Sequence, residues 1–195
     1  SGFEFSAAWN KSFRDWNIGI RLNGSTLKNE AIEVGDPIFS KSDSAQDGDN
    51  WDNHSITQNG HPVGSYYGWK VAGIFRSQAE IDEMNRLAVE KGVESGVYQD
   101  PTTQPGDYKF VDLNNDGQIT DADRTVLGDG YPKFVYGLNL SASWKNLDFS
   151  MNLYGVAGMD ILSYSSARLT SVYAPDGGYQ NVLKEYIENA WSPSN

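Results

Sequence analysis

The chain has 195 residues, a length that fits one domain or a large piece of one. Its net charge of −11 disfavours non-specific binding to nucleic acid or to anionic membranes. The absence of cysteine excludes a disulfide framework, a zinc–thiolate site and a cysteine nucleophile. Aromatic residues reach 13% and there are 20 glycines, a composition typical of strands and turns. We expect no transmembrane helix and no signal peptide, and we interpret the chain as a piece of a longer protein.

Four segments alternate apolar and polar residues with a period of two, which predicts β-strands. They are residues 3–9, 16–22, 134–144 and 147–154. A short polar turn at 10–15 joins the first pair, and residues 145–146 join the second pair. A region of roughly a hundred residues separates the pairs, and another of about forty follows, both longer than ordinary loops.

Short turns alternating with long loops are typical of outer-membrane β-barrels. Trp9, Trp16 and Trp144 fall at the short-turn ends, where an aromatic girdle would lie. The organisation predicted is therefore a barrel hairpin at 1–29, a long extracellular loop region at 30–132, a second barrel hairpin at 133–155 and a second extracellular loop at 156–195. An ordinary β-sandwich or open sheet remains the alternative, because alternation does not separate lipid-facing from core-facing strands.

The long loop region has its own expected elements. Residues 36–60 are polar and acidic, and residues 60–75 read as a turn followed by a strand. A helix is predicted next, because Ser77 and Glu80 form a capping box and Gly92 ends the pattern. Its expected apolar stripe consists of Ile81, Met84, Leu87 and Ala88. A second short helix is expected at 181–191, with Val182, Leu183, Tyr186, Ile187 and Ala190 on its buried side.

Residues 112–123 fit a twelve-residue calcium loop. Asp112, Asn114 and Asp116 supply oxygens at positions 1, 3 and 5, Gln118 offers its carbonyl at position 7, and Asp123 closes the site at position 12. Gly117 at position 6 permits the sharp turn, and the spacing suits a hard cation that needs several oxygens at once. We therefore predict a structural Ca²⁺ that neutralises the clustered carboxylates.

Two features depart from a standard EF-hand. Position 12 is Asp rather than Glu, as in dockerin-type loops, and residues 107–111 upstream read as a strand rather than a helix. The alternative is an acidic turn that binds no metal.

Other chemistry is weaker in this sequence. His54 and His61 lie in no metal or triad spacing, and no nucleophile elbow, phosphate loop or zinc-protease signature is present. We therefore expect no enzyme activity. Tyr66, Tyr67 and Trp69 are candidates for stacking on a sugar ligand, with burial in a loop core as the alternative. Tyr173 and Tyr179 are similar candidates. Without neighbouring basic residues these aromatics do not predict nucleic-acid binding.

Several segments together resemble the SusC/RagA family of TonB-linked outer-membrane proteins of Bacteroidetes. They are Gly60-His61-Pro62-Val63-Gly64-Ser65-Tyr66-Tyr67-Gly68, Val71-Ala72-Gly73-Ile74-Phe75, residues 105–117, Asp123-Arg124-Thr125-Val126-Leu127-Gly128, residues 132–140 and Gly155-Val156-Ala157-Gly158-Met159-Asp160-Ile161. As a chained set they are specific, whereas the calcium loop alone is not.

The resemblance implies a large barrel with a plug that imports oligosaccharides or peptides. It also implies energy from the TonB system, a SusD-like surface lipoprotein as partner, and an outer-membrane location with the long loops outside the cell. The fold class expected is thus mainly β with short helices, a fragment of a transmembrane antiparallel barrel. Exposed strand edges also predict self-association of the fragment. Two other functions remain open: a secreted, calcium-stabilised carbohydrate-binding module and a glycoside-active enzyme.

Overall fold

The computed structural model describes residues 1–40, 54–163, 165–166, 169–170 and 181–192. The chain divides into two compact units. The first unit comprises residues 1–38, 57–65 and 128–161, and the second comprises residues 39–56, 66–127 and 162–195. Each unit is described by itself, within the described residues.

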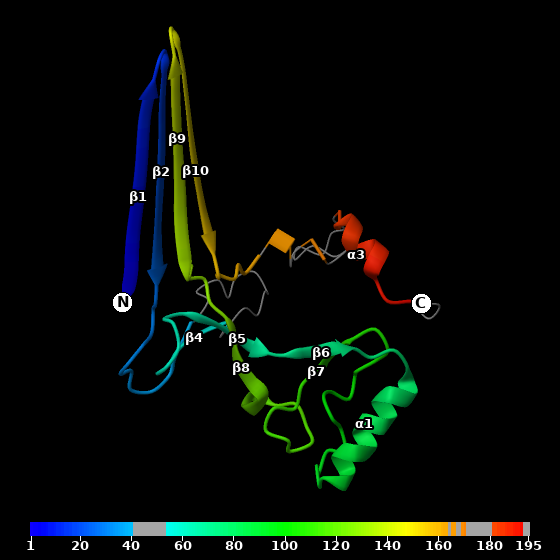
Figure 1. Ribbon diagram of the computed structural model, residues 1–195. Helices are drawn as coiled ribbons and strands as arrows, with labels where there is room; N and C mark the ends of the chain where they lie inside the picture. Colours follow the sequence, from blue (N-terminus) through cyan, green and yellow to red (C-terminus); the bar gives the residue numbers. More distant parts are fainter. Residues whose placement is uncertain (41–53, 164, 167–168, 171–180, 193–195) are drawn as a thin grey trace. The chain divides into compact units, whose positions relative to one another are not determined.

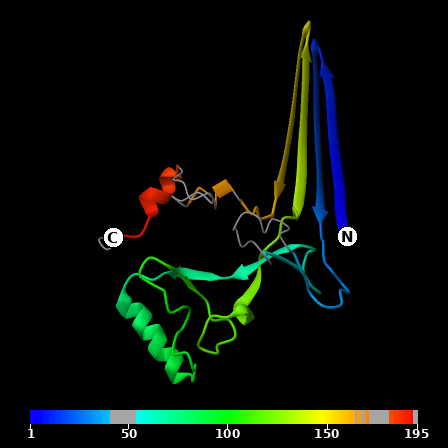
Figure 2. The ribbon, with the colours of Figure 1, turned by 180° about the vertical axis from the view of Figure 1, so that it is seen from behind.

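The first unit is built on one antiparallel sheet of four long strands in the order β1-β2-β9-β10 (Figure 1). These strands are β1 (Gly2–Phe13), β2 (Trp16–Leu27), β9 (Phe134–Trp144) and β10 (Leu147–Ala157). The two hairpins are joined through β2 and β9, which pair from Trp16↔Trp144 to Thr26↔Phe134. The same four strands lie side by side when seen from behind (Figure 2). The predicted antiparallel strands are therefore confirmed, and all four share one sheet.

The first turn is shorter than the sequence indicates. Residues 10–13 were expected in a polar turn, but they continue β1 and pair with residues 16–19 of β2. Only Arg14 and Asp15 form the loop, matching Lys145 and Asn146 in the second hairpin. The expectation was wrong because it relied on the polarity of these residues. Strand pairing depends on backbone hydrogen bonds, which polar residues make as well as apolar ones.

Short strands make up the remaining sheets. The strands β3 (Ile38–Phe39), β4 (Ser55–Thr57), β5 (Ser65–Trp69) and β8 (Arg124–Gly128) form a sheet in that order. The strands β6 (Val71–Ile74) and β7 (Tyr108–Phe110) form a two-stranded antiparallel sheet. The turn and strand expected over 60–75 are thus present, with Gly60 and Gly64 at positive φ before β5.

The helix α1 (Gln78–Glu90) begins and ends where the sequence predicts. The Ser77 hydroxyl accepts the Glu80 N–H at 3.3 Å, and Gly92 follows the helix with a φ of +87°. The Glu80 carboxylate does not return to Ser77; it accepts the N–H of Arg76 at 3.0 Å. This arrangement still satisfies two N–H groups at the start of the helix.

The apolar core of the second unit gathers around α1. Ile81 and Ala88 of α1 pack with Phe75 and Tyr98, all at most 6% exposed. Met84, Val93 and Ile119 pack against this cluster. Burying each large side chain contributes roughly 1.5–3 kcal/mol, so the cluster fixes α1 beside the segment that leads into the predicted calcium loop. Leu87, expected in the apolar stripe, is 37% exposed at the edge of this core.

The second helix is shorter and more exposed than expected. It spans α3 (Lys184–Asn189) rather than 181–191, and Tyr186 and Ile187 are exposed rather than buried. Leu183 at the N-cap has no side-chain oxygen to accept the first N–H groups, so no cap extends the helix. Tyr173, Tyr179 and residues 41–53 of the acidic stretch lie outside the described residues.

Candidate functional site

One face of the four-stranded sheet is mainly apolar along its length, with Lys11 and Thr26 as its polar members. Residues directly opposite one another in an antiparallel pair share a face, so the register places whole rows of side chains together. These rows contain Phe3, Phe5, Ala7, Trp9, Phe13, Trp16, Ile18, Ile20, Leu22, Phe134, Tyr136, Leu138, Leu140, Ala142, Trp144, Leu147, Phe149, Met151 and Leu153. Leu22 is 42% exposed and Phe149 is 59% exposed, so this face is open in the described chain.

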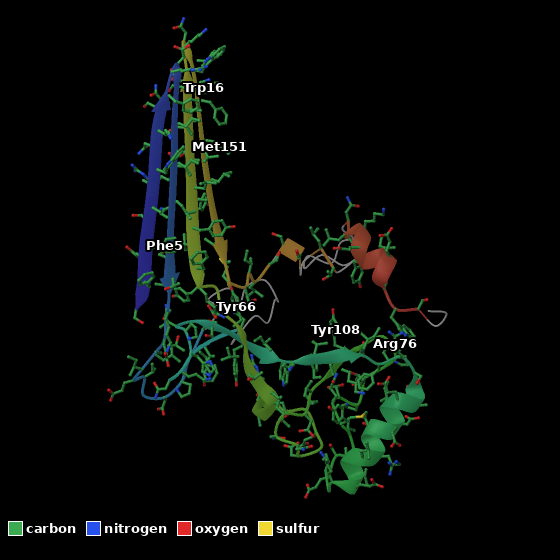
Figure 3. The ribbon with its side chains drawn as sticks, viewed as in Figure 1. Phe5, Trp16, Tyr66, Arg76, Tyr108 and Met151 are labelled. Carbon is green, nitrogen blue, oxygen red and sulfur yellow. The ribbon has the colours of Figure 1, made fainter. Side chains whose placement is uncertain are left out.

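Aromatic residues occupy both ends of the apolar face. At the turn end the Trp16 and Trp144 rings stack with centroids 5.7 Å apart. At the opposite end the Phe5 and Phe134 rings stack at 6.5 Å. Figure 3 shows Phe5 and Trp16 near the two ends of the sheet. The rows between carry mainly aliphatic residues, so the face has an aliphatic band between two aromatic rows.

The length of the apolar face, with its aromatic rows included, matches a membrane. Phe3 and Phe13 are ten residues apart on β1, which is about 34 Å along a strand. Tilting the strand by roughly 40°, as in outer-membrane barrels, reduces the height to about 26 Å, close to the ~25 Å apolar band of such barrels. The aromatic rows then fall at the two interfaces, where aromatic girdles lie.

The opposite face of the same sheet is polar. Glu4, Arg21, Asn23, Asn139 and Asn152 alternate with the apolar residues, and the Asn139 amide donates to the Asn152 side chain across β9 and β10. A sheet that is apolar on one side and polar on the other is compatible with the wall of a water-filled or plugged barrel, and also with a sheet that covers a protein core. Among the described residues, α1 and α3 are both too short and too polar to cross a bilayer as helices.

The predicted calcium loop lies in the second unit, between β7 and the 3₁₀ helix Asp121–Asp123. Asn115 and Gly117 adopt positive φ angles of 66° and 96°, which turn the chain sharply at positions 4 and 6. The Asp112 and Asn114 side-chain oxygens both accept the N–H of Asp116, at 3.2 and 2.9 Å. Because the two oxygens share one donor, positions 1 and 3 are brought together.

Position 5 joins the same group. The Asn114 amide lies 2.8 Å from one Asp116 oxygen, and the other Asp116 oxygen accepts the N–H of Gln118 at 3.0 Å. Asp112, Asn114 and Asp116 therefore meet as the motif requires. The observed Gln118 contact uses its N–H, whereas position 7 of such loops binds the ion through its carbonyl, so that role of Gln118 stays a prediction.

Asp123 plays a role that the spacing alone does not reveal. It is fully buried, and its carboxylate accepts the N–H groups of Leu113 at 2.8 Å, Asn114 at 3.3 Å and Thr120 at 2.8 Å. These bonds tie the start of the loop to its end. The Thr120-x-x-Asp123 capping box would have indicated this role from the sequence.

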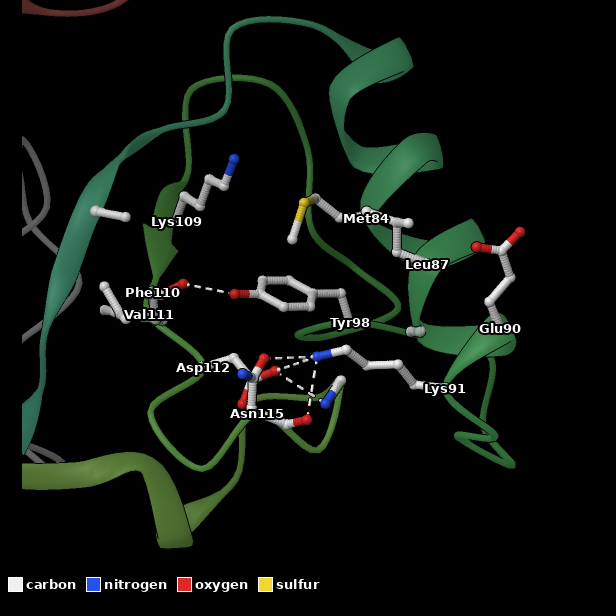
Figure 4. Close-up of a pocket in the computed structure, with 13 residues that line it drawn as sticks. Met84, Leu87, Glu90, Lys91, Tyr98, Lys109, Phe110, Val111, Asp112 and Asn115 are labelled. Carbon is white, nitrogen blue, oxygen red and sulfur yellow. Dashed lines mark hydrogen bonds and ion pairs between the residues drawn. The ribbon is translucent and has the colours of Figure 1, made fainter.

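Lys91, directly after α1, contacts the outside of the loop. Its ammonium lies 3.3 Å from an Asp112 oxygen and bonds to both oxygens of Asn115, at 3.1 and 2.9 Å (Figure 4). Burial raises the pKa of Asp112, but the Gly117 N–H, the Lys91 ammonium and the Asn115 N–H together bring the pKa below its ordinary value. No local sequence signal pointed to Lys91, because it lies in a different element from the loop.

The donor set partly fits a hard cation. The Asp112 and Asn114 side-chain oxygens converge on the Asp116 N–H, which suits Ca²⁺, but the Asn114 group that faces the Asp116 carboxylate is its NH2, which is not a cation ligand. However, no three acidic, histidine or cysteine side chains gather as a metal-binding group within the described part of the chain. Any ion here would therefore also need the Asn114 amide and backbone carbonyls. Calcium binding stays a prediction.

The aromatic residues of β5 are largely engaged with other side chains. The Arg124 guanidinium lies 4.8 Å from the Tyr67 ring centre and 4.9 Å from that of Trp69. The Trp69 indole N–H donates to the Thr120 carbonyl at 2.7 Å, which joins β5 to the calcium-type loop. Tyr66 lies on the other face of the strand. Tyr66, Tyr67 and Trp69 are half-buried, and ligand stacking on them stays a prediction.

A cavity of about 560 Å³ lies between α1, β7 and the calcium-type loop. Figure 4 shows Tyr98 reaching into this region, where its hydroxyl donates to the Phe110 carbonyl at 2.8 Å. Burial raises the pKa of the Tyr98 hydroxyl. Lys91 and Lys109 line the cavity, but Lys109 is paired with Glu80 at 2.9 Å and Lys91 with Asp112. The cavity is thus mainly apolar, with its ammonium groups already engaged.

The chain is similar to two curated proteins of Formosa agariphila. It is 29% identical over 197 residues to TonB-dependent receptor P3 and 31% identical over 136 residues to TonB-dependent receptor P26. These alignments cover 100% and 70% of this chain. The solved RagAB peptide transporter has the same fold over 100% of the chain, with a TM-score of 0.61 and 16% identity. The chain is a SusC/RagA-like piece of a TonB-dependent receptor.

This SusC/RagA-like segment spans 18% and 12% of the two curated relatives and 18% of the RagAB chain. No family model matches it. The expected fold class, a piece of an antiparallel outer-membrane barrel with short helices, is confirmed by the sheet and by the structural match. The relatives are named as receptors rather than enzymes, in line with the function class expected from the sequence.

Proposed function

We propose that this segment supplies part of the membrane wall and part of the outer loops of a nutrient importer. The observation that carries the proposal is the two-faced sheet, whose apolar face has aromatic rows at a separation that suits a bilayer. The polar face then borders the path or the plug inside the barrel. The substrate class that fits the SusC/RagA likeness is an oligosaccharide or a peptide.

The whole receptor would depend on two partners. TonB would supply energy from the inner membrane, and a SusD-like lipoprotein would sit over the outer loops and capture the substrate. The support for both is the likeness to TonB-dependent receptors and to the RagAB transporter.

The second unit would lie outside the cell. The chain leaves β2 and enters β9 at the ends opposite to the two-residue turns, and barrels of this kind have their short turns on the periplasmic side. Intact cells carrying the whole receptor test this orientation. Asp121→Cys should react with a membrane-impermeant maleimide on intact cells. Asn146→Cys, at the tip of the second turn, should react only after the outer membrane is permeabilised.

The reverse labelling pattern, or equal labelling of both variants on intact cells, would contradict the proposed orientation. Both positions are exposed, so a difference in reactivity would report membrane sidedness rather than burial. The chain has no cysteine of its own, so no native thiol of this segment competes.

The loop at 112–123 would bind Ca²⁺ as a structural ion. Asp112, Asn114, Asp116 and the Gln118 carbonyl would hold the ion, and Asp123 would close the site at position 12 while also keeping the two arms of the loop together. The ion would supply positive charge to the carboxylates and rigidity to the long loop. The meeting of the Asp112 and Asn114 oxygens at the Asp116 N–H, together with the spacing of the motif, supports this assignment.

Titration calorimetry of the whole receptor tests the calcium assignment. We expect binding in the micromolar range that is lost in Asp112→Ala/Asp116→Ala. Asp82→Ala/Glu94→Ala removes the same charge from exposed positions of the same unit and should leave calcium binding unchanged. Equal loss in both double variants would mean diffuse charge attraction, and no binding by the wild-type receptor would make the motif an acidic turn.

A further inference from the structure

The two hairpin tips of the sheet are neighbours. The β1–β2 turn consists of Arg14 and Asp15, and the β9–β10 turn consists of Lys145 and Asn146. The Lys145 N–H donates to the Asp15 carbonyl at 3.3 Å, which holds the tips side by side. The first residue of each turn is basic, so two cationic side chains start from adjacent tips.

Both basic residues occupy an unfavourable backbone conformation. Arg14 and Lys145 each have a φ of 52°, in the left-handed region that glycine and asparagine adopt more easily. Neither residue takes part in an ion pair within the described ranges. Each hairpin turn thus has a long basic side chain at a strained backbone position, and no ion pair with a carboxylate of the described residues accounts for that choice.

These cations adjoin the apolar face of the sheet. The Lys145 ammonium lies 5.0 Å from the Trp144 ring centre, and Trp144 stacks on Trp16 in the last row of that face. Lys11 projects from the same face one row earlier, opposite Ile18. A lysine there reaches the nearest interface by extending its stem along the apolar surface.

The charge at this end contrasts with that of the chain as a whole. Lys11, Arg14 and Lys145 gather there with one turn carboxylate, that of Asp15, on a chain whose net charge is −11. Asp148 lies on the polar face of the sheet, opposite Ser143. The bulk charge disfavours anionic surfaces in general, so a basic group confined to the edge of the apolar face points to a local ligand.

We propose that the two tips bind the phosphate headgroup of an anionic phospholipid. The Arg14 guanidinium and the Lys145 ammonium would contact the phosphate, Lys11 would add charge from the lipid side, and the Trp16–Trp144 pair would pack on the glycerol and upper acyl chain. The inference rests on the proposed function in one respect, since it requires the apolar face to lie in the bilayer.

Native mass spectrometry of the whole receptor in detergent tests this site, with phosphatidylglycerol and phosphatidylcholine as probes. Arg14→Asn/Lys145→Asn removes both charges while placing a residue that tolerates positive φ, so the hairpins should form at least as well. We expect phosphatidylglycerol affinity to fall at least about fivefold, with phosphatidylcholine unchanged. The control Lys28→Gln/Lys133→Gln removes two charges near the other strand ends and should change neither.

Charge-conserving variants complete the test. Arg14→Lys/Lys145→Arg should retain phosphatidylglycerol binding, and millimolar inorganic phosphate should not displace the lipid, because the site also holds its glycerol and acyl region. Unchanged phosphatidylglycerol binding in the asparagine variant would overturn the proposal, as would full displacement by free phosphate. Failure of the proposed function would look different, because neither phospholipid would then bind the wild-type receptor at this face.

Discussion

At the scale of single residues, Asp123 holds the calcium-type loop in shape. Its buried carboxylate accepts three backbone N–H groups, so Asp123→Ala would leave them without an acceptor at a cost of roughly 1–3 kcal/mol each in full burial. We expect amide hydrogen exchange over residues 113–120 to accelerate at least about thirtyfold, measured by mass spectrometry on the whole receptor. Asp121→Ala, two residues away and exposed, should leave these amides unchanged; equal acceleration in both variants would refute this role.

Glu80 gives a pH dependence with a definite sign. The Lys109 hydrogen bond and the Arg76 N–H lower the pKa of Glu80 below its ordinary value of 4.5. A carboxylate with a lowered pKa in the folded state stabilises that state above its ordinary pKa, and this contribution is lost as pH falls through the lowered value. We therefore expect the first turn of α1 to open more readily below about pH 4.5. Amide hydrogen exchange of this turn, corrected for the intrinsic effect of pH on exchange, measures the opening.

A matched variant separates this effect from general acid unfolding. Lys109→Met removes the largest cause of the lowered pKa, so the first turn of α1 should open more readily at neutral pH and its opening should depend less on pH below about 4.5 than in the wild type. The difference in exchange rate should be only a few-fold, because the Lys109 and Glu80 side chains are 25% and 34% exposed and water therefore screens the pair. An identical pH profile in the two proteins would show that Glu80 does not control this turn.

The sequence predicted the loop residues better than their individual roles. The spacing of Asp112, Asn114 and Asp116 placed them together because a tight turn at Gly117 leaves little choice. Lys91 was missed because its contact with Asp112 joins residues 21 apart and depends on how α1 packs. Tyr67 and Trp69 were considered as ligand-stacking residues because the sequence could not show that Arg124, more than fifty residues away, packs on their rings.

At the scale of elements, alternation predicted β9 to its ends, whereas β1 and β2 continue several residues further than the pattern indicated. Strand pairing determines these ends, because polar residues complete the ladder as well as apolar ones. The pairing of β2 with β9 could not be predicted from local pattern. Residues 28–133 lie between the two strands, and nothing in either strand specifies its distant partner.

Aromatic rings leave no room for a Cβ atom at two glycines of the apolar face. A Cβ at Gly24 would lie 2.6 Å from the Phe5 ring, and one at Gly155 would lie 2.5 Å from the Tyr136 ring. Gly24→Val should therefore displace Phe5 and lower the temperature at which the barrel unfolds in heat-modifiability gels. The control is Ala7→Val, one row away on the same face, where the residue already has a Cβ; it should lower that temperature less. An equal decrease in both variants would show that the close contact with the Phe5 ring does not matter.

At the scale of the whole molecule, the two-faced sheet connects the fold to the proposed position in the membrane. A sheet with a polar face and an apolar face needs either a protein core or a bilayer against the apolar side. The apolar side is exposed in this chain and has aromatic rows at both ends. At the strand tilt of outer-membrane barrels its length corresponds to the apolar band of such barrels. The edge strands β1 and β10 also leave ladder groups for further strands, and self-association of the isolated segment stays a prediction.

Spin-label accessibility in the reconstituted receptor tests the central claim most directly, namely that the apolar face lies in lipid. Single-cysteine labels would replace Ile20 and Leu140 on the apolar face, and their sequence neighbours Arg21 and Asn139 on the polar face. We predict that labels at Ile20 and Leu140 are relaxed strongly by oxygen and weakly by a polar nickel chelate, with less oxygen preference at Arg21 and Asn139. Equal behaviour on the two faces, or chelate access at Ile20 and Leu140, would contradict the account.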